Sequence, residues 1–396
     1  MNVLVINAGS SSLKYQLMNP ETGEVAAKGL CERIYIDGRL THKVGDKKVE
    51  KNIPMPTHAE AIQAVLEILQ DPEHGVIKSV DEIDAVGHRV LHGGMKFSDS
   101  CIIDEKVIKA IEDCIPLGPL HNPANLMGIR ACQAVMPQTP QVAVFDTAFH
   151  MTMPPKAYRY AIPTEYYEND DIRRYGFHGT SHKYVTRRAI ALMGRSDIKI
   201  VNCHLGNGSS MSAVKDGKCQ DTSMGLSPLA GVPMGTRSGD IDACVVQFIM
   251  NKYGMSADEC LNMLNKKSGV LALSNGLSSD FRDLESGAKE GNEACQLARD
   301  KFAYECCKYV GSYAAALGGL DCLVFTAGVG ENDSGIRAAV CQNLEFMGVK
   351  LDPEKNKLRG DERLISAEDS KVKVWVIPTN EELMIAQDTA ELVNNA

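Results

Sequence analysis

The sequence predicts an α/β protein made of two similar halves, and three observations support this prediction. A glycine-serine loop occurs twice, at residues 7–14 and 205–212, each time directly after an apolar run typical of a β-strand. Strand-like apolar runs and helical segments alternate along the chain. The 396 residues are also enough for two domains, each with its own hydrophobic core. Because the loop occurs in both halves, we expect the halves to face each other across a nucleotide cleft.

The two loops indicate what such a cleft would hold. Each loop reads as a strand, a tight turn rich in glycine and serine, and a second strand. Glycine lets the backbone approach a phosphate group closely, clustered N–H groups form a concave nest, and serine hydroxyls add further donors. One such turn is more often only a turn, whereas a pair favours duplicated phosphate-binding hairpins.

The composition excludes several classes of protein. The net charge is −9, and no run of Lys and Arg is longer than two residues, which argues against binding to nucleic acid through a basic patch. The start of the chain has no basic region, and no apolar stretch reaches the length of a membrane span. The 13 cysteines are scattered without a C-x-x-C pair, which is typical of buried thiols in a reducing compartment. We therefore expect a soluble protein of the cytoplasm with no membrane partner.

Local patterns predict the elements in order. Thr57 and Glu60 form a capping box that begins a helix with apolar residues at helical spacing, which ends at Asp71-Pro72. Nearly all the strand-like runs are continuous, which is typical of strands that are covered on both faces. In such sheets the polar groups that do chemistry lie just past the carboxyl ends of the strands. The expected strands are 85–87, 142–145, 198–201, 322–325 and 372–377, and the expected helices are 181–193, 242–253, 293–317 and 381–394.

Several polar motifs follow these strands. Asp146 comes directly after an apolar run, where it either takes part in chemistry or caps the next turn. The segment 328–330 reads as a Gly-x-Gly turn before a helix at 336–344, a common pattern that is also compatible with a nucleotide. Glu381 and Glu382 fall in the first turn of the last helix, where the helix dipole favours carboxylates in any case.

Arginine and histidine carry a stronger signal. Arg89 and Arg237 lie among glycines, where they cover no core, and the guanidinium group is suited to a bidentate grip on carboxylate or phosphate. His178 precedes a helix, where backbone donors already favour an anion. His178 and His182 are also spaced like a metal pair, but no third ligand is near. For His121 the residues alone indicate a structural role. Neither a Walker A loop, the nearest miss being 231–238, nor a His-Arg-Asp kinase loop occurs.

These motifs, with others between them, follow a fixed order: VINAGSSSLKYQL, GHRVLHGG, LHNP, VFDTAFH, YGFHGTSHKYV, HLGNGSS, MGTRSGDID, NKKSGVLALS, SSDFRDL, FTAGVGEN and IPTNEEL. In this order and spacing the chain resembles the acetate kinases, which include short-chain propionate and butyrate kinases, from Val3 to about Ala390. The resemblance implies the duplicated ribonuclease H-like fold of acetate kinase, sugar kinases, Hsc70 and actin, with domains at 1–147 plus 384–396 and at 148–383. It also implies a homodimer that converts ATP and acetate to ADP and acetyl phosphate with Mg²⁺ or Mn²⁺.

The resemblance further implies roles for individual residues. Arg89 and Arg237 match the arginines that bind the substrate and the transition state, and His178 matches the transition-state histidine. Asp146 matches the acid/base residue, and His121 matches a histidine of the active site. Asn7 and Glu381 match the magnesium positions. The ATP-binding segments correspond to Lys14, His204, Leu205, Gly206, Asn207, Gly208, Asp280, Phe281, Arg282, Gly328, Val329, Gly330, Glu331 and Asn332.

The chemistry of the implied reaction modifies two of these expectations. A carboxylate substrate is already ionised at pH 7, so Asp146 is expected to orient Mg²⁺ or its waters rather than to move a proton. Leu91 stands where the family typically has valine, and a smaller acid pocket would favour acetate over propionate. Because an acyl phosphate hydrolyses in water, we also expect closure over the substrates. Propionate kinase, a pyrophosphate-using variant, a small-molecule sensor and a non-catalytic ATP clamp of the Hsc70 or actin type remain open as alternatives.

Overall fold

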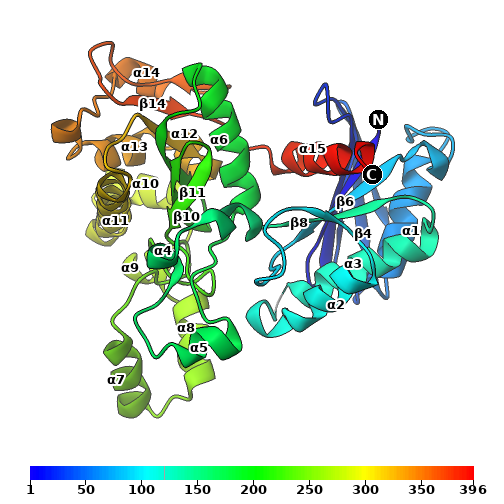
Figure 1. The fold of residues 1–396 in the computed structure, drawn as a ribbon, viewed down its shortest axis with the longest axis horizontal. Coiled ribbons are helices and arrows are strands. Elements are labelled where there is room, and N and C mark those ends of the chain that lie inside the picture. The colour runs from blue at the N-terminus through cyan, green and yellow to red at the C-terminus, as the bar shows by residue number, and fades with distance from the viewer. Residues whose placement is uncertain (120) are drawn as a thin grey trace. The chain divides into compact units, whose positions relative to one another are not determined.

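Each glycine-serine loop joins two antiparallel strands, and each pair of strands belongs to a separate sheet (Figure 1). The computed structural model describes residues 1–119 and 121–396, so Leu120 of the LHNP segment lies outside the described residues. The chain divides into a first unit, Met1–Phe149 with Asn380–Ala396, and a second unit, His150–Thr379. The domain boundaries expected at 147/148 and 383/384 stay a prediction.

The first unit is an eight-stranded sheet in the order β5-β4-β3-β2-β1-β6-β8-β7. Leu4 and Ile6 pack with α1 and α3 on one face of β1, whereas Val3 and Val5 pack with α15 on the other face. This two-sided burial explains why the apolar run 3–6 is continuous. The elements are β1 Val3–Ala8, β2 Ser12–Met18, β3 Val25–Glu32, β4 Arg39–Val44, β5 Lys47–Asn52, α1 His58–Leu69, β6 Ala85–Val90, β7 Cys101–Ile102, α2 Glu105–Asp113, α3 Asn122–Val135, β8 Gln141–Phe145 and α15 Glu381–Asn394.

The second unit is a six-stranded sheet in the order β11-β10-β9-β12-β14-β13. Val201, Cys203 and Leu205 of β9 join the core formed with α11, and the alternate residues Asn202 and His204 contact α6 on the opposite face. The strands are β9 Lys199–Leu205, β10 Ser209–Lys215, β11 Lys218–Thr222, β12 Cys322–Thr326, β13 Arg363–Leu364 and β14 Lys373–Val376. The helices are α4 Pro155–Tyr158, α5 Glu165–Asp170, α6 Gly179–Met193, α7 Ala243–Tyr253, α8 Ala257–Lys266, α9 Gly269–Leu273, α10 Phe281–Lys289, α11 Glu293–Leu317, α12 Ala327–Asn332, α13 Ser334–Cys341 and α14 Pro353–Lys357.

The two sheets share one core topology. In the first unit β3, β2 and β1 are antiparallel neighbours, and β6 and β8 continue the sheet parallel to β1. In the second unit β11, β10 and β9 are antiparallel neighbours, and β12 and β14 continue parallel to β9. The expected duplication of an α/β unit is therefore confirmed. The glycine-serine loop occupies the same place in both units, between the first and second strands of the core.

Most of the expected elements form, and three of them differ from the expectation. The capping box of α1 is complete, since Thr57 accepts from the Ala59 N–H and Glu60 accepts from the Thr57 N–H. The segment 328–330 is not a turn: it lies inside helix α12, and the helix expected at 336–344 begins earlier, at Ser334. The strand expected at 372–377 is shorter, and its residues alternate in burial. Among the described residues, no helix combines the length and the apolar character that crossing a membrane requires.

Candidate active site

The first hairpin places two of the predicted site residues side by side. Asn7 at the end of β1 and Lys14 on β2 are direct cross-strand partners. The turn between them is closed by a hydrogen bond from the Gly9 N–H to the Ser12 carbonyl at 2.7 Å. Because directly opposite residues of an antiparallel pair share a face, both side chains lie on the same side of the sheet.

Arg89 and Asp146 form a close ion pair at the ends of neighbouring parallel strands. Nη2 of Arg89 lies 2.5 Å from Oδ2 of Asp146, and Nε lies 3.3 Å from Oδ1, so the contact is bidentate. The Asp146 side chain is 1% exposed and that of Arg89 is 20% exposed. The Asp146 charge raises the pKa of Arg89 above its ordinary value, and Nη1 of Arg89 also lies 3.5 Å from Oδ1 of Asn7. The β1, β6 and β8 strand ends therefore bring three predicted site residues together.

Glu381 adds a second carboxylate to the residues around Arg89, which together form the half-site of the first unit. It occupies the first turn of α15, and its charge contributes to the raised pKa of Arg89. Burial, followed by the neighbouring charge of Asp146, raises the pKa of Glu381 to about 7. Carboxylate and amide oxygens are ligands that Mg²⁺ prefers, and Mg²⁺ usually keeps several waters and needs only one or two carboxylates. Asn7, Asp146 and Glu381 fit this pattern, although the described residues contain no ready cage of three or more His, Cys, Asp or Glu.

Leu91 and His121 lie near these groups in the chain but differ in exposure. Leu91 is 6% exposed, and its N–H donates to Oδ1 of Asn125 at 3.0 Å. Nδ2 of Asn125 donates to the carbonyl of Ala8, so this buried amide ties the Leu91 segment to the first hairpin. His121 is exposed at the N-cap of α3. Asn125 was not among the predicted site residues. The sequence marks it only as an asparagine in the first turn of an apolar helix.

The second hairpin gathers a different set of groups. A Cβ atom at Gly208 would lie 3.4 Å from Nε2 of His178 and 3.8 Å from Nη1 of Arg237, so the loop backbone, the imidazole and the guanidinium converge. The Gly235 N–H donates to the Asn207 carbonyl at 2.9 Å, which joins the Arg237 loop to the hairpin. A Cβ atom at Gly235 would lie 1.8 Å from Oδ1 of Asn207, so a larger residue here would displace the Asn207 side chain.

Arg237 differs from Arg89 in its partners. Its Nη1 donates to the Pro228 carbonyl at 3.0 Å and lies 3.4 Å from Sδ of Met234. Among the described residues, no carboxylate forms an ion pair with it, and burial lowers its pKa below the ordinary value. A partly buried guanidinium without a counter-charge is suited to bind an anion.

His178 is held in an unusual conformation beside this arginine. Its backbone φ is 58°, in the left-handed region, at the N-cap of α6. Its ring stacks on that of His204 with centroids 4.2 Å apart, and its Nδ1 lies 2.9 Å from Oγ of Ser210. Non-glycine residues in this region are strained and cluster at functional sites.

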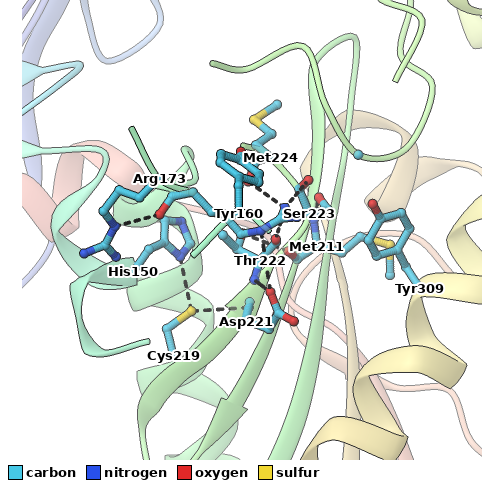
Figure 2. A network of polar contacts seen from close by, with 12 residues as sticks. His150, Tyr160, Arg173, Met211, Cys219, Asp221, Thr222, Ser223, Met224 and Tyr309 are labelled. Atoms are coloured by element: carbon cyan, nitrogen blue, oxygen red, sulfur yellow. Dashed lines mark hydrogen bonds and ion pairs between the residues drawn. The ribbon is translucent and has the colours of Figure 1, made fainter. Parts of the chain in front are cut away.

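His150 anchors the backbone directly before His178. Nε2 of His150 lies 3.0 Å from the Phe177 carbonyl, and Nδ1 lies 3.3 Å from Sγ of Cys219. Figure 2 shows His150 beside Cys219, whose Sγ also lies 3.3 Å from the Asp221 carbonyl oxygen. Burial lowers the pKa of His150 to about 4, so the ring is neutral at pH 7. A neutral ring has one N–H, which the Phe177 carbonyl requires as its donor.

A cavity of about 620 Å³ in the second unit collects most of the predicted ATP segments. Asp280, Phe281 and Arg282 begin helix α10 on one side, and α12 and the hairpin loop form the other sides. Four further lining residues were not predicted: Ser279 belongs to the SSDFRDL motif but was not assigned a role, and no motif marks Glu285, Asp333 and Arg359. The predicted residues that line the cavity are Gly206, Asn207, Asp280, Phe281, Arg282, Gly328, Val329 and Asn332.

The remaining predicted ATP residues lie outside the lining of this cavity. Leu205 belongs to the hydrophobic core, and the Glu331 carboxylate accepts from the Thr379 N–H at 3.1 Å. His204 contacts Ser181 through Nδ1 at 2.8 Å. Lys14 lies in the first unit and lines another cavity of about 420 Å³ there. Gly208 lies beside His178 and Arg237, and the Gly330 carbonyl accepts from Arg337.

The duplicated topology, with a glycine-serine hairpin in each unit, defines the fold that acetate kinases, sugar kinases, Hsc70 and actin share. The sequence model of the acetokinase family matches residues 2–387, and the chain belongs to this family. It is 59% identical to the acetate kinase of Lachnoclostridium phytofermentans, over 99% of this chain and 100% of that protein. It is 60% identical to the acetate kinase of Caldanaerobacter subterraneus subsp. tengcongensis, over 99% of both chains.

Solved structures agree with the sequence comparisons. The crystal structure of Porphyromonas gingivalis acetate kinase matches with a TM-score of 0.96 and 48% identity, over 99% of both chains. A propionate kinase from Francisella tularensis matches with a TM-score of 0.92 and 43% identity, also over 99% of both chains. These matches confirm the predicted family and fold class.

Proposed function

We propose that the protein catalyses the reversible transfer of the γ-phosphoryl group between ATP and acetate, which gives acetyl phosphate and ADP. The observation that carries the proposal is the convergence of Arg237, His178 and the Gly208 backbone, three kinds of donor suited to the equatorial oxygens of a phosphoryl group. Relatives of 59–60% identity that span the whole chain are acetate kinases. An ATP clamp without phosphoryl transfer would not need a guanidinium and an imidazole to converge at the transferred group.

The transfer needs little proton chemistry. A carboxylate oxygen of acetate forms a bond to the γ-phosphorus while the bond from that phosphorus to the β,γ-bridging oxygen breaks, and ADP leaves with the electron pair. No proton moves, so a general base is not required. Arg89 binds the acetate carboxylate, and Arg237 with His178 stabilises charge on the transferred group. Mg²⁺, held by oxygens of Asn7 and Glu381 with a bound water oriented by Asp146, would neutralise charge on the phosphates.

Asp146 holds Arg89 in this scheme. Both of its oxygens face the guanidinium in the bidentate contact, and its side chain is 1% exposed. In this proposal Asp146 orients the arginine and a magnesium-bound water and moves no proton. The remaining half-site residue, Leu91, would contact the methyl group of the acid and favour acetate over propionate.

Hydroxylamine trapping of the acyl phosphate tests the proposal. Purified protein is incubated with Mg-ATP, hydroxylamine and acetate, propionate or butyrate in parallel, with Arg89→Ala as the control. We expect most hydroxamate with acetate and almost none from the variant. A propionate kinase would instead give most product with propionate. No hydroxamate with any acid would contradict the proposal and leave a nucleotide-binding clamp or sensor.

We also propose that two copies of the chain associate through helix α7. None of the 11 residues of α7 is buried, and Phe248 and Tyr253 are 62% and 67% exposed. Val245 on the same helix and Ile241 just before it are also exposed apolar residues. Exposed apolar side chains gathered on one helix are typical of an interface. Sedimentation should show a dimer that Phe248→Glu converts to a monomer, while Lys252→Glu on the same helix leaves the dimer intact. A monomeric wild-type protein would contradict this proposal.

A further inference from the structure

A chain of buried hydrogen bonds reaches His178 from within the second unit. Nδ1 of His178 lies 2.9 Å from Oγ of Ser210, and the same hydroxyl lies 2.7 Å from Nε2 of His182. Nδ1 of His182 in turn lies 3.0 Å from Oγ of Ser212, which lies 3.4 Å from Nδ2 of Asn202. All four residues behind His178 are 0% exposed. Solvent therefore does not complete these hydrogen bonds, and each proton must be assigned within the chain.

The donors and acceptors fix the direction in which each hydrogen bond of this network is donated. With Nδ2 assigned to the side of the amide that faces Thr186 and Ser212, Asn202 donates to Oγ1 of Thr186 at 2.8 Å and to Oγ of Ser212. The proton of the Ser212 hydroxyl then has Nδ1 of His182 as its acceptor. With that nitrogen accepting, the proton of the neutral His182 ring lies on Nε2 and is donated to Ser210.

Ser210 continues the same order of donor and acceptor toward His178. Its hydroxyl oxygen accepts from His182, so its own proton is available for Nδ1 of His178. A neutral His178 ring then carries its proton on Nε2, the nitrogen beside Gly208 and Arg237. Burial and the nearby rings of His150 and His204 lower the pKa of His182 well below its ordinary value. A ring that stays neutral keeps a single proton, which the one-directional chain requires.

We propose that His182, acting through Ser210, fixes His178 as the tautomer that carries its proton on Nε2, so that this N–H points to the transferred phosphoryl group. The opposite tautomer would present a lone pair to the phosphoryl oxygens and repel them. His182 is thus a positioning residue, and His178 is the group that touches the substrate. The inference rests on the proposed function for what His178 contacts, but the tautomer itself can be measured without any substrate.

The tautomer is tested by ¹⁵N NMR on the full-length protein labelled at histidine. Spectra are recorded at about pH 8, where an ordinary histidine with a pKa of about 6.5 is neutral. The His178 signals are assigned by their absence from His178→Gln. We expect the wild-type ring to be protonated on Nε2, and Ser210→Ala to give a mixture of both tautomers. Ser181→Ala removes a similar buried contact between a serine and His204, and should leave the His178 tautomer unchanged.

Kinetics of the same variants separate positioning from general structure. Removing the partner that orients a metal-ligating imidazole typically costs about 10-fold to 100-fold, and we expect a similar loss for His178. Ser210→Ala should lower kcat by this amount while the KM for acetate stays unchanged. His182→Phe should act like Ser210→Ala, and His182→Gln, whose amide can still donate to Ser210, should restore the tautomer and most of kcat.

Five outcomes decide between these possibilities. A wild-type His178 protonated on Nδ1, or a His178 tautomer that Ser210→Ala does not change, would overturn the inference. A changed tautomer with unchanged kcat would overturn the positioning role. The expected tautomer shift together with a loss of kcat supports it. Wild-type protein that forms no hydroxamate would overturn the proposed function, and the NMR result would be unaffected by that failure.

Discussion

The two units build the same hairpin but balance the charge of the neighbouring arginine in opposite ways. In the first unit Arg89 forms a bidentate ion pair with Asp146, and Glu381 lies close enough to raise its pKa further. In the second unit Arg237 contacts a carbonyl and a thioether, and burial lowers its pKa. The half-site of the first unit is rich in carboxylates. In the second unit, no carboxylate among the described residues balances the charge of Arg237.

This difference fits the two different roles that we propose for the two units. Carboxylates around Arg89 restrain its guanidinium and leave oxygens suited to a divalent cation. The uncompensated Arg237 gains most when negative charge arrives, because a desolvated cation interacts strongly with an anion. The first unit is therefore suited to orient the acid and the metal, and the second to stabilise phosphoryl charge.

The largest effect is expected from removing the uncompensated arginine. Arg237→Ala should lower kcat by about 10³-fold to 10⁵-fold, the range for arginines that stabilise phosphoryl transfer. Because no carboxylate loses a partner, the melting temperature should change little. Arg237→Lys, which keeps the charge but not the fork geometry, should recover only part of the rate. Hydroxamate formation measures the rate, and a loss of less than tenfold would remove the proposed contrast between the two arginines.

The compensated arginine should respond differently. Arg89→Ala removes the guanidinium from a buried carboxylate, so it should cost about 3–5 kcal/mol of unfolding free energy as well as activity. Arg89→Met combined with Asp146→Leu removes both charges, and should restore stability without restoring activity. Urea unfolding followed by circular dichroism provides the measurement. Equal stability losses in the single and the double variant would show that the ion pair has no special role.

The sequence predicted these two half-sites unequally well. Asn7, Arg89, Asp146 and Glu381 were expected at strand and helix ends, and strand order alone brings the first three together. The duplicated core followed from the repeated loop and from continuous apolar runs. The opposite partners of the arginines could not be predicted, because they depend on which distant segments supply carboxylates or carbonyls.

Other features could not be predicted from the sequence for a similar reason. The chain of hydrogen bonds through Ser210 and Ser212 depends on alternate residues of β10 facing α6, and the run 209–212 reads equally well as a loop. Asn125 and Arg359 contribute through tertiary contacts that no local motif announces. The helix at 327–332 contains glycines that read as a turn, and only its packing in the folded unit reveals it as a helix.

Acidification should lower the stability of the protein through buried histidines such as His150. Burial lowers the pKa of His150 to about 4, whereas an unfolded histidine titrates near about 6.5. The unfolded state therefore binds more protons between these values, and stability is lost as the pH falls from about 6.5 to about 4. His150→Gln should reduce the slope by up to about 1.4 kcal/mol per pH unit. Fluorescence of Trp375, the single tryptophan, reports unfolding of the second unit. An unchanged slope would show that the pKa of His150 is not lowered in the native state.

The smallest effect concerns the choice of acid in the first unit. Leu91 is 6% exposed, and a Cβ atom at Gly118 would lie 3.2 Å from its Cδ2, so its side chain is closely packed. Leu91→Val removes one methylene, which is worth about 10-fold in substrate discrimination at the low end. The ratio of kcat/KM for propionate to that for acetate should therefore rise by about this factor, while kcat with acetate stays within about twofold, since the methylene adds little to binding the small acid. Val329→Ile in the second unit, which lines the 620 Å³ cavity, serves as the control and should leave the ratio unchanged. If both variants shift the ratio equally, acid selection does not reside in the first unit, and the division of roles between the two halves would have to be abandoned.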